Sequence, residues 1–113
     1  AVKWQRDHFA EIPALMIPCL SFDSPPDDTW RAGAGSGGSI WPAVQNLLLT
    51  ARSLGLGAAL TTLGLSDRPA AKAVLGLPEL VEPYAIIPVG YPTGKFGPLS
   101  RQPLEKVVHF DRW

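Results

Sequence analysis

The chain has 113 residues, of which 46% are hydrophobic and 18% are charged, a composition that fits one globular domain and excludes a disordered chain. Ten basic residues balance ten acidic ones without a basic run, so nothing favours nucleic acid or an anionic membrane as a partner. No apolar run approaches the roughly 20 residues of a membrane span. The single cysteine, Cys19, excludes an internal disulfide and favours a cytoplasmic location.

The first third of the chain predicts the end of an amphipathic helix, one strand and a long loop. Residues 1–12 mix apolar and charged positions, and Pro13 closes this helix. The continuous apolar run of residues 14–20 predicts a buried strand, and Pro18 within it indicates a sheet edge or a bulge. Residues 21–38 are rich in proline and glycine and predict a flexible loop of a length that is often functional.

The clearest predicted helix follows this loop. Ser39 is a candidate cap, Pro42 suits the first turn, and Gly55 ends the helix. Its apolar positions follow helical spacing: Val44, Leu47, Leu48, Ala51 and Leu54. Ala43 and Leu49 extend the apolar surface beyond this stripe, which predicts a central helix or one at a subunit interface.

The second half predicts strands that alternate with a short helix. Residues 58–63 predict a strand, and residues 70–75 a helix that Ser66 or Asp67 caps and Gly76 ends. A buried strand is expected at residues 84–89, a loop at 91–97 and a terminal strand at 107–110. This order of elements predicts an α+β or α/β layer arrangement.

Most motifs in the chain have a plain structural explanation. Gly33, Gly35 and Gly38 fit the spacing of a dinucleotide-binding loop, but polar loop residues precede them where a strand is required. A flexible glycine loop is therefore the favoured interpretation. The two histidines and Cys19 lack metal-ligand spacing, so no metal site is expected, and no nucleophile motif occurs.

Three segments keep a functional alternative beside the structural one. Thr61 and Thr62 at a strand end often pair across a sheet, although the small residues before them would let a flat ligand approach the backbone. Residues 88–92 form a constrained turn after a strand. Arg101, followed closely by Pro103, suits a phosphate, whereas a solvated surface arginine is the more frequent case.

Together these segments resemble the second half of the nitroreductase family. The resemblance covers residues 38–57 (GSIWPAVQNLLLTARSLGLG), residues 75–78 (LGLP) with 88–92 (PVGYP), and residues 101–109 (RQPLEKVVH). Their order and spacing, from about Pro13 onward, carry the likeness more than any single motif. It implies an α+β fold, with a mixed sheet flanked by helices, of which residues 1–113 form the C-terminal half. The tail of residues 98–113 would then extend to a partner subunit as a C-terminal strand.

The resemblance also implies a cofactor and its binding residues. Members of the family are homodimers with FMN at the subunit interface, and pass hydride from NAD(P)H to nitroaromatic or quinone-type acceptors. By this likeness Leu60, Thr61 and Thr62 face the isoalloxazine ring, with Thr62 as a donor to flavin N5, and Arg101 binds the phosphate. No proton-transfer dyad is expected, because the flavin carries the chemistry. Trp30, Trp41 and Phe96 are candidates to stack on an aromatic substrate, although packing explains them equally well.

One departure from the family pattern keeps a second hypothesis open. The first half of the family carries an Arg-Arg-Ser-like motif for the phosphate and the pyrimidine edge, and nothing in residues 1–12 matches it. A chain that began at Ala1 would be expected to bind FMN weakly, and to need upstream residues or a second polypeptide for activity. The alternative is a non-catalytic fragment or a dimerisation and interaction module that has lost flavin binding.

Overall fold

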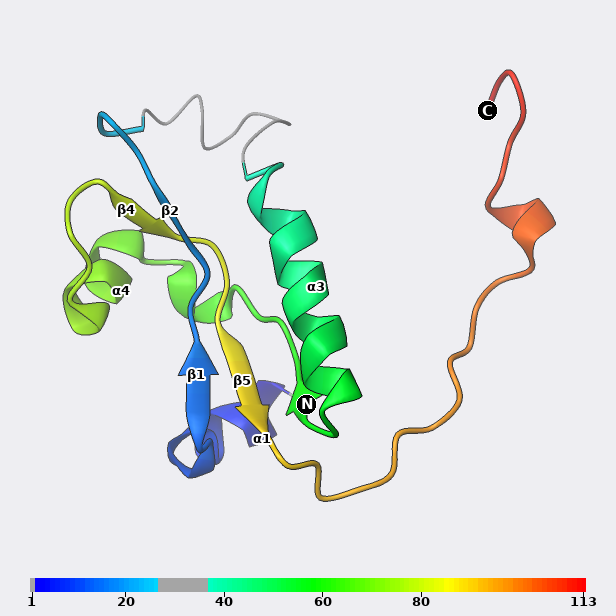
Figure 1. The fold of residues 1–113 in the computed structure, drawn as a ribbon, viewed down its shortest axis with the longest axis horizontal. Coiled ribbons are helices and arrows are strands. Elements are labelled where there is room, and N and C mark those ends of the chain that lie inside the picture. The colour runs from blue at the N-terminus through cyan, green and yellow to red at the C-terminus, as the bar shows by residue number, and fades with distance from the viewer. Residues whose placement is uncertain (1, 27–36) are drawn as a thin grey trace.

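Small antiparallel sheets and one long helix make up the body of the chain (Figure 1). The structure is a computed structural model and describes residues 2–26 and 37–113. In chain order its elements are α1 (Val2–Asp7), η1 (Phe9–Glu11), β1 (Ala14–Met16), β2 (Cys19–Ser21), α3 (Ile40–Ser53), β3 (Gly57–Ala58), η2 (Leu63–Leu65), α4 (Arg68–Leu75), β4 (Val81–Pro83), β5 (Ile87–Gly90) and η3 (Leu104–Lys106), where η marks a 3-10 helix. This mixed α and β content agrees with the predicted α+β class.

The strands of the described residues form two sheets. The antiparallel pairing of β1 with β5 in one sheet is followed, after a break, by the pairing of β2 with β4 in the other. A three-stranded sheet has the order β1-β5-β3, and β2 pairs with β4 in a second sheet. The break lies at Pro18, whose carbonyl accepts the Tyr84 N–H at 2.9 Å. The strand expected at residues 84–89 is confirmed only in part, because β5 begins at Ile87. Tyr84 and Ala85 cross from β4 to β5, and β4 lies before the predicted range.

The strand predicted over residues 14–20 is likewise divided. Pro18 lies in the gap between β1 and β2, and β1 is an edge strand, as the proline indicated. The predicted burial is wrong for β1, because Ala14, Leu15 and Met16 are all exposed on the sheet edge. The β2 residues Cys19 and Leu20 are half-buried.

The core lies between β5 and the long helix α3. Its buried residues are Ile40, Val44, Tyr84, Ala85, Ile87 and Val89, and the partly buried Leu20, Leu47, Leu48, Leu56 and Ala58 pack against them. The predicted helix and its end are confirmed, since Gly55 adopts a φ of 77° directly after α3. Two details differ: the Ser39 side chain makes no capping hydrogen bond, and Leu54 is 68% exposed although it lies on the predicted stripe.

The short helix α4 is held to β4 by a buried carboxylate. Asp67 caps the helix, accepting the Ala70 N–H at 3.0 Å, and Gly76 ends it with a φ of 63°. The side chain of Glu82 on β4 is 3% exposed and contacts Lys72 Nζ at 2.9 Å and Arg68 Nη1 at 3.5 Å. Both cations lie on α4, so this cluster fixes the helix against the second sheet.

Two predicted strands are shorter or absent in the structure. Residues 58–63 form only the end of β3 and an isolated bridge between Thr61 and Ile86, after which the chain turns into η2. The terminal strand expected at residues 107–110 does not form, and every residue from Tyr91 to Trp113 is exposed. A strand needs a hydrogen-bonded neighbour, and this segment of the single chain has none in its described surroundings.

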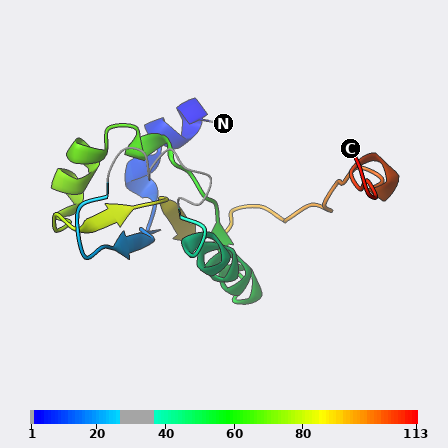
Figure 2. The same ribbon diagram turned by 90° about the horizontal axis from the view of Figure 1, so that it is seen from above.

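The C-terminal segment instead extends away from the body, as both ribbon views show (Figures 1 and 2). The radius of gyration is 17.0 Å, whereas a compact domain of this length has about 13 Å. Within residues 2–26 and 37–113, no helix is long and apolar enough to cross a membrane.

Gly37 and Gly55 offer a matched test of how the loop before α3 meets the core. Both have positive φ, 72° and 77°, but a Cβ on Gly37 would lie 2.5 Å from Tyr84 Cε1, whereas one on Gly55 would meet no atom within 4 Å. Gly55→Ala should lower the free energy of unfolding by about 1 kcal/mol through backbone strain alone. Gly37→Ala should lower it by a further ~1–3 kcal/mol through the clash, measured by urea unfolding. Equal losses for the two variants would contradict the Gly37–Tyr84 contact.

Candidate functional site

The segment that follows β3 leaves one edge of the sheet open. Thr61 exchanges both of its backbone hydrogen bonds with Ile86, at 3.0 Å and 2.9 Å. In an antiparallel pair, the N–H groups of successive residues point to opposite sides of the strand. The pairing of Thr61 therefore turns the N–H groups of Leu60 and Thr62 toward the unpaired edge.

Thr62 keeps its donors free at this edge. Within the part of the chain that the structure describes, neither its N–H nor its hydroxyl makes a hydrogen bond, while its carbonyl accepts the Leu65 N–H at 2.9 Å. The Thr61 hydroxyl, by contrast, accepts the Leu63 N–H at 3.3 Å and serves the local turn. Leu60 is 42% exposed and Thr62 is exposed.

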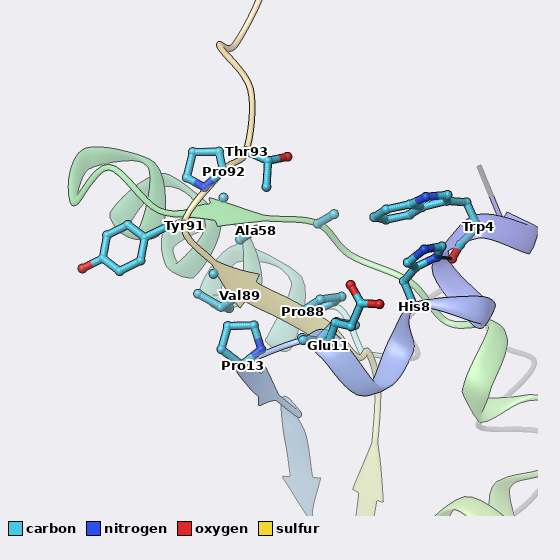
Figure 3. A pocket seen from close by; sticks show the side chains of 14 residues that line it. Trp4, His8, Glu11, Pro13, Ala58, Pro88, Val89, Tyr91, Pro92 and Thr93 are labelled. Atoms are coloured by element: carbon cyan, nitrogen blue, oxygen red, sulfur yellow. Dashed lines mark hydrogen bonds between the residues drawn. The ribbon is translucent and has the colours of Figure 1, made fainter.

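Two cavities are lined by the residues that come directly before and directly after Leu60–Thr62 in the sequence. The first, of about 380 Å³, is lined by the backbone of residues 57–59, by the β5 end and by the α1–η1 segment (Figure 3). Trp4 and His8 stack at one side of it, with ring centroids 4.3 Å apart. The second cavity, of about 420 Å³, lies beyond the edge and is lined by residues 63–67 together with side chains of β1 and α4. The edge residues themselves line neither cavity.

Arg101 lies on the extended tail and not beside this edge. Its guanidinium donates only to the neighbouring Ser100 carbonyl, at 3.0 Å, and forms no ion pair within the described residues. Residues 98–113 stand apart from the body in both ribbon views (Figures 1 and 2). The single chain therefore does not bring Arg101 together with Leu60, Thr61 and Thr62. Their roles remain predictions.

The other candidates from the sequence have structural partners or lie outside the described residues. Trp30, Gly33 and Gly35 belong to the latter group. Trp41 packs edge-to-face on Tyr84, with centroids 6.0 Å apart, and the Phe96 ring lies 3.8 Å from the Arg52 guanidinium.

Cys19 and His109 also have structural contacts of their own. Cys19 is half-buried and donates to the Ile17 carbonyl at 3.3 Å, and burial raises the pKa of its thiol, which disfavours the reactive thiolate. His109 packs against Trp113, with centroids 4.4 Å apart. No group of three or more His, Cys, Asp or Glu side chains gathers within the described ranges as a metal site would require.

Sequence reasoning missed the cavity beside residues 57–59, and it named Thr62 as a donor only through the family resemblance. The cavity combines α1, β3 and the end of β5, which are far apart in sequence, so no local pattern could indicate it. The direction of the Thr62 N–H depends on the pairing of Thr61 with Ile86, a long-range contact. Apart from the family resemblance, the segment's signal was its small residues beside two threonines.

Comparison with known proteins connects the chain to one family. The Nitroreductase family matches residues 1–91. A curated protein of Methanothermobacter thermautotrophicus, named "Putative NADH dehydrogenase/NAD(P)H nitroreductase", is 38% identical over 73 residues, which are 63% of this chain and 38% of that protein. Two crystal structures carry the same name. The one from Parabacteroides distasonis has a TM-score of 0.65 and 32% identity, over 88% of this chain and 55% of that chain.

The second structure, from Bacteroides thetaiotaomicron, has a TM-score of 0.60 at 22% identity, over 99% of this chain and 84% of that chain, and supports the fold alone. The α+β fold of the resembled family is thereby confirmed. The matched region spans 38% of the Methanothermobacter protein and 55% of the Parabacteroides chain, so much of each has no counterpart in the alignment.

Proposed function

We propose, from the premise that this chain belongs to the nitroreductase family, that it is the C-terminal portion of an FMN-dependent NAD(P)H oxidoreductase. The observation that carries the proposal is the open edge at Leu60–Thr62, where the Thr62 N–H is unbonded among the described residues. The relatives' name, which refers to NAD(P)H and to nitroreductase activity, supports the class of reaction. Nitroaromatics or quinones are the proposed acceptors.

The residues at this edge suit the flat ring of FMN. Residues 57–59 are glycine and alanine, so their own side chains shield the strand backbone little, although Pro92 and Phe96 lie near the open face of Gly57. Thr62 offers an N–H and a hydroxyl that could donate to flavin N5. Bound flavin would supply the redox chemistry, taking hydride from NAD(P)H and passing it to the acceptor. The protein's own part is to hold the ring flat, orient it and donate this hydrogen bond.

Arg101 suits the phosphate end of the same ligand. A guanidinium presents five N–H donors in a planar fork that matches phosphate oxygens. In this chain it has no carboxylate partner within the described residues, so phosphate binding would displace no ion pair. Because Arg101 lies on the extended tail, we propose that it completes a flavin site on a second copy of the chain.

A homodimer also accounts for the apolar surface that the chain exposes. Along the tail, Leu99, Leu104, Phe110 and Trp113 are 81%, 70%, 84% and 99% exposed. Leu49 on α3 and Leu54 at its end are 58% and 68% exposed. Apolar side chains gathered in this way on a globular protein mark an interaction surface. The proposed cytoplasmic location rests on the single cysteine, which fits a reducing compartment.

Flavin binding provides the direct test of the proposed function. The full-length protein should bind FMN, with flavin absorbance that NAD(P)H bleaches and fluorescence that changes on titration. Arg101→Ala should weaken FMN affinity by roughly 10- to 100-fold, the size of a lost hydrogen bond to a charged group. Arg112→Ala, a change at another exposed tail arginine, should leave the affinity unaltered. A colourless protein that FMN cannot reconstitute would overturn the enzyme proposal and favour the interaction module.

Removal of the tail tests the proposed dimer. The full-length protein should sediment as a dimer, and a variant that ends at Gly97 should sediment as a monomer, because it lacks the exposed apolar side chains of residues 98–113. Circular dichroism should show that the truncated variant keeps its helices, since α3 and α4 lie before the cut. A truncated protein that still dimerises with unchanged affinity would show that the tail does not hold the subunits together.

A further inference from the structure

The root of the tail is held at one point, where the Phe96 ring lies between two elements of the body. On one side, the Arg52 guanidinium of α3 lies 3.8 Å from the centroid of the ring. On the other side is β3, where a Cβ built on Gly57 would lie 3.9 Å from Phe96 Cζ and 3.6 Å from Pro92 Cβ. A side chain at this position would thus be in ordinary van der Waals contact with the ring, so the ring lies over the open face of this glycine.

Phe96 differs in this respect from the other aromatic residues of the C-terminal segment. It is 49% exposed, whereas Tyr91, Phe110 and Trp113 are 84–99% exposed. It is flanked by Gly94 and Gly97, neither of which would bring a Cβ within 4 Å of another atom. The anchored ring thus interrupts a segment whose neighbouring backbone has freedom to turn. Arg101 lies five positions further along the chain.

We propose that Arg52 is a positioning residue for the C-terminal tail: its stack on Phe96 sets the point and direction of departure from the body, and thereby the path on which Arg101 reaches a phosphate. The path of Arg101 to a phosphate rests on the proposed function, whereas the anchoring of the tail rests on the contacts of Phe96 alone. Arg52 also lies in the last turn of α3, where the helix dipole favours a cation.

The expected effect follows from the strength of such a stack. At an exposed site, a cation–π contact changes an equilibrium by a factor of about two to five. Arg52→Gln removes the charge and keeps most of the side-chain length, and Phe96→Leu removes the ring. Arg52→Lys keeps a cation that can still lie over the ring, and should restore most of the effect. Lys95→Gln, a charge removed at the exposed neighbour of Phe96, is the matched control.

Two measurements on the full-length protein test the proposal. The first is the heteronuclear NOE of the backbone amides of Gly97, Leu99, Ser100 and Arg101 without flavin, which should fall in Arg52→Gln and Phe96→Leu but not in Lys95→Gln. The second is FMN affinity, which Arg52→Gln should weaken about two- to fivefold. This loss should vanish when Arg52→Gln is added to Arg101→Ala, because a residue that acts through Arg101 has nothing left to position.

The outcomes separate the two proposals. An unchanged NOE in Arg52→Gln overturns the anchoring role, whatever the flavin result. A loss of FMN affinity of equal size in the wild-type and Arg101→Ala backgrounds overturns the link to Arg101 and indicates a general structural effect. If the wild-type protein binds no FMN, the proposed function fails, while the NOE still decides whether Arg52 holds the tail root.

Discussion

The two-sided pairing of β5 is the constraint on which the rest of the structure depends. This strand lies between β1 and β3, and Ile87 and Val89 point from it into the core against α3. Directly before it, Ile86 pairs with Thr61 and thereby fixes the segment that follows β3. A shift of this register by one residue would turn the N–H of Thr62 toward the sheet and that of Thr61 toward the open edge. The same contacts that bury the core therefore determine which donor is available for a ligand.

The helices of this chain could be predicted from local sequence, because their ends depend on neighbouring residues. Asp67 and Gly76 bound α4 as expected, and Gly55 follows α3 in the left-handed conformation. The strands could not be predicted in the same way. Tyr84 and Ala85 are apolar and read as strand, but they are the crossing between two sheets, and only the partner segment at Pro18 determines that.

Local sequence patterns predicted the candidate site even less well than they predicted the strands. Leu60, Thr61, Thr62 and Arg101 were selected through the family resemblance, since a pair of threonines and a surface arginine are common in any protein. The structure distinguishes the two threonines. Thr61 is hydrogen-bonded to Ile86 and Leu63, whereas the N–H and the hydroxyl of Thr62 make no hydrogen bond within the described residues. The structure also adds Arg52 and Phe96, which no sequence motif connected.

The energetics of the tail explain why its strand is absent from the single chain. Fixing the backbone of one residue costs about 1–2 kcal/mol, so ordering residues 98–113 is expensive. Burying a large apolar side chain returns about 1.5–3 kcal/mol, and the most exposed side chains of the tail, such as Phe110 and Trp113, gain this only against another surface. Side-chain burial alone cannot order the whole segment, so backbone pairing must contribute as well. In the proposed homodimer, a sheet edge on a second copy would supply both terms at once, and a strand there would be formed by assembly and not by local propensity.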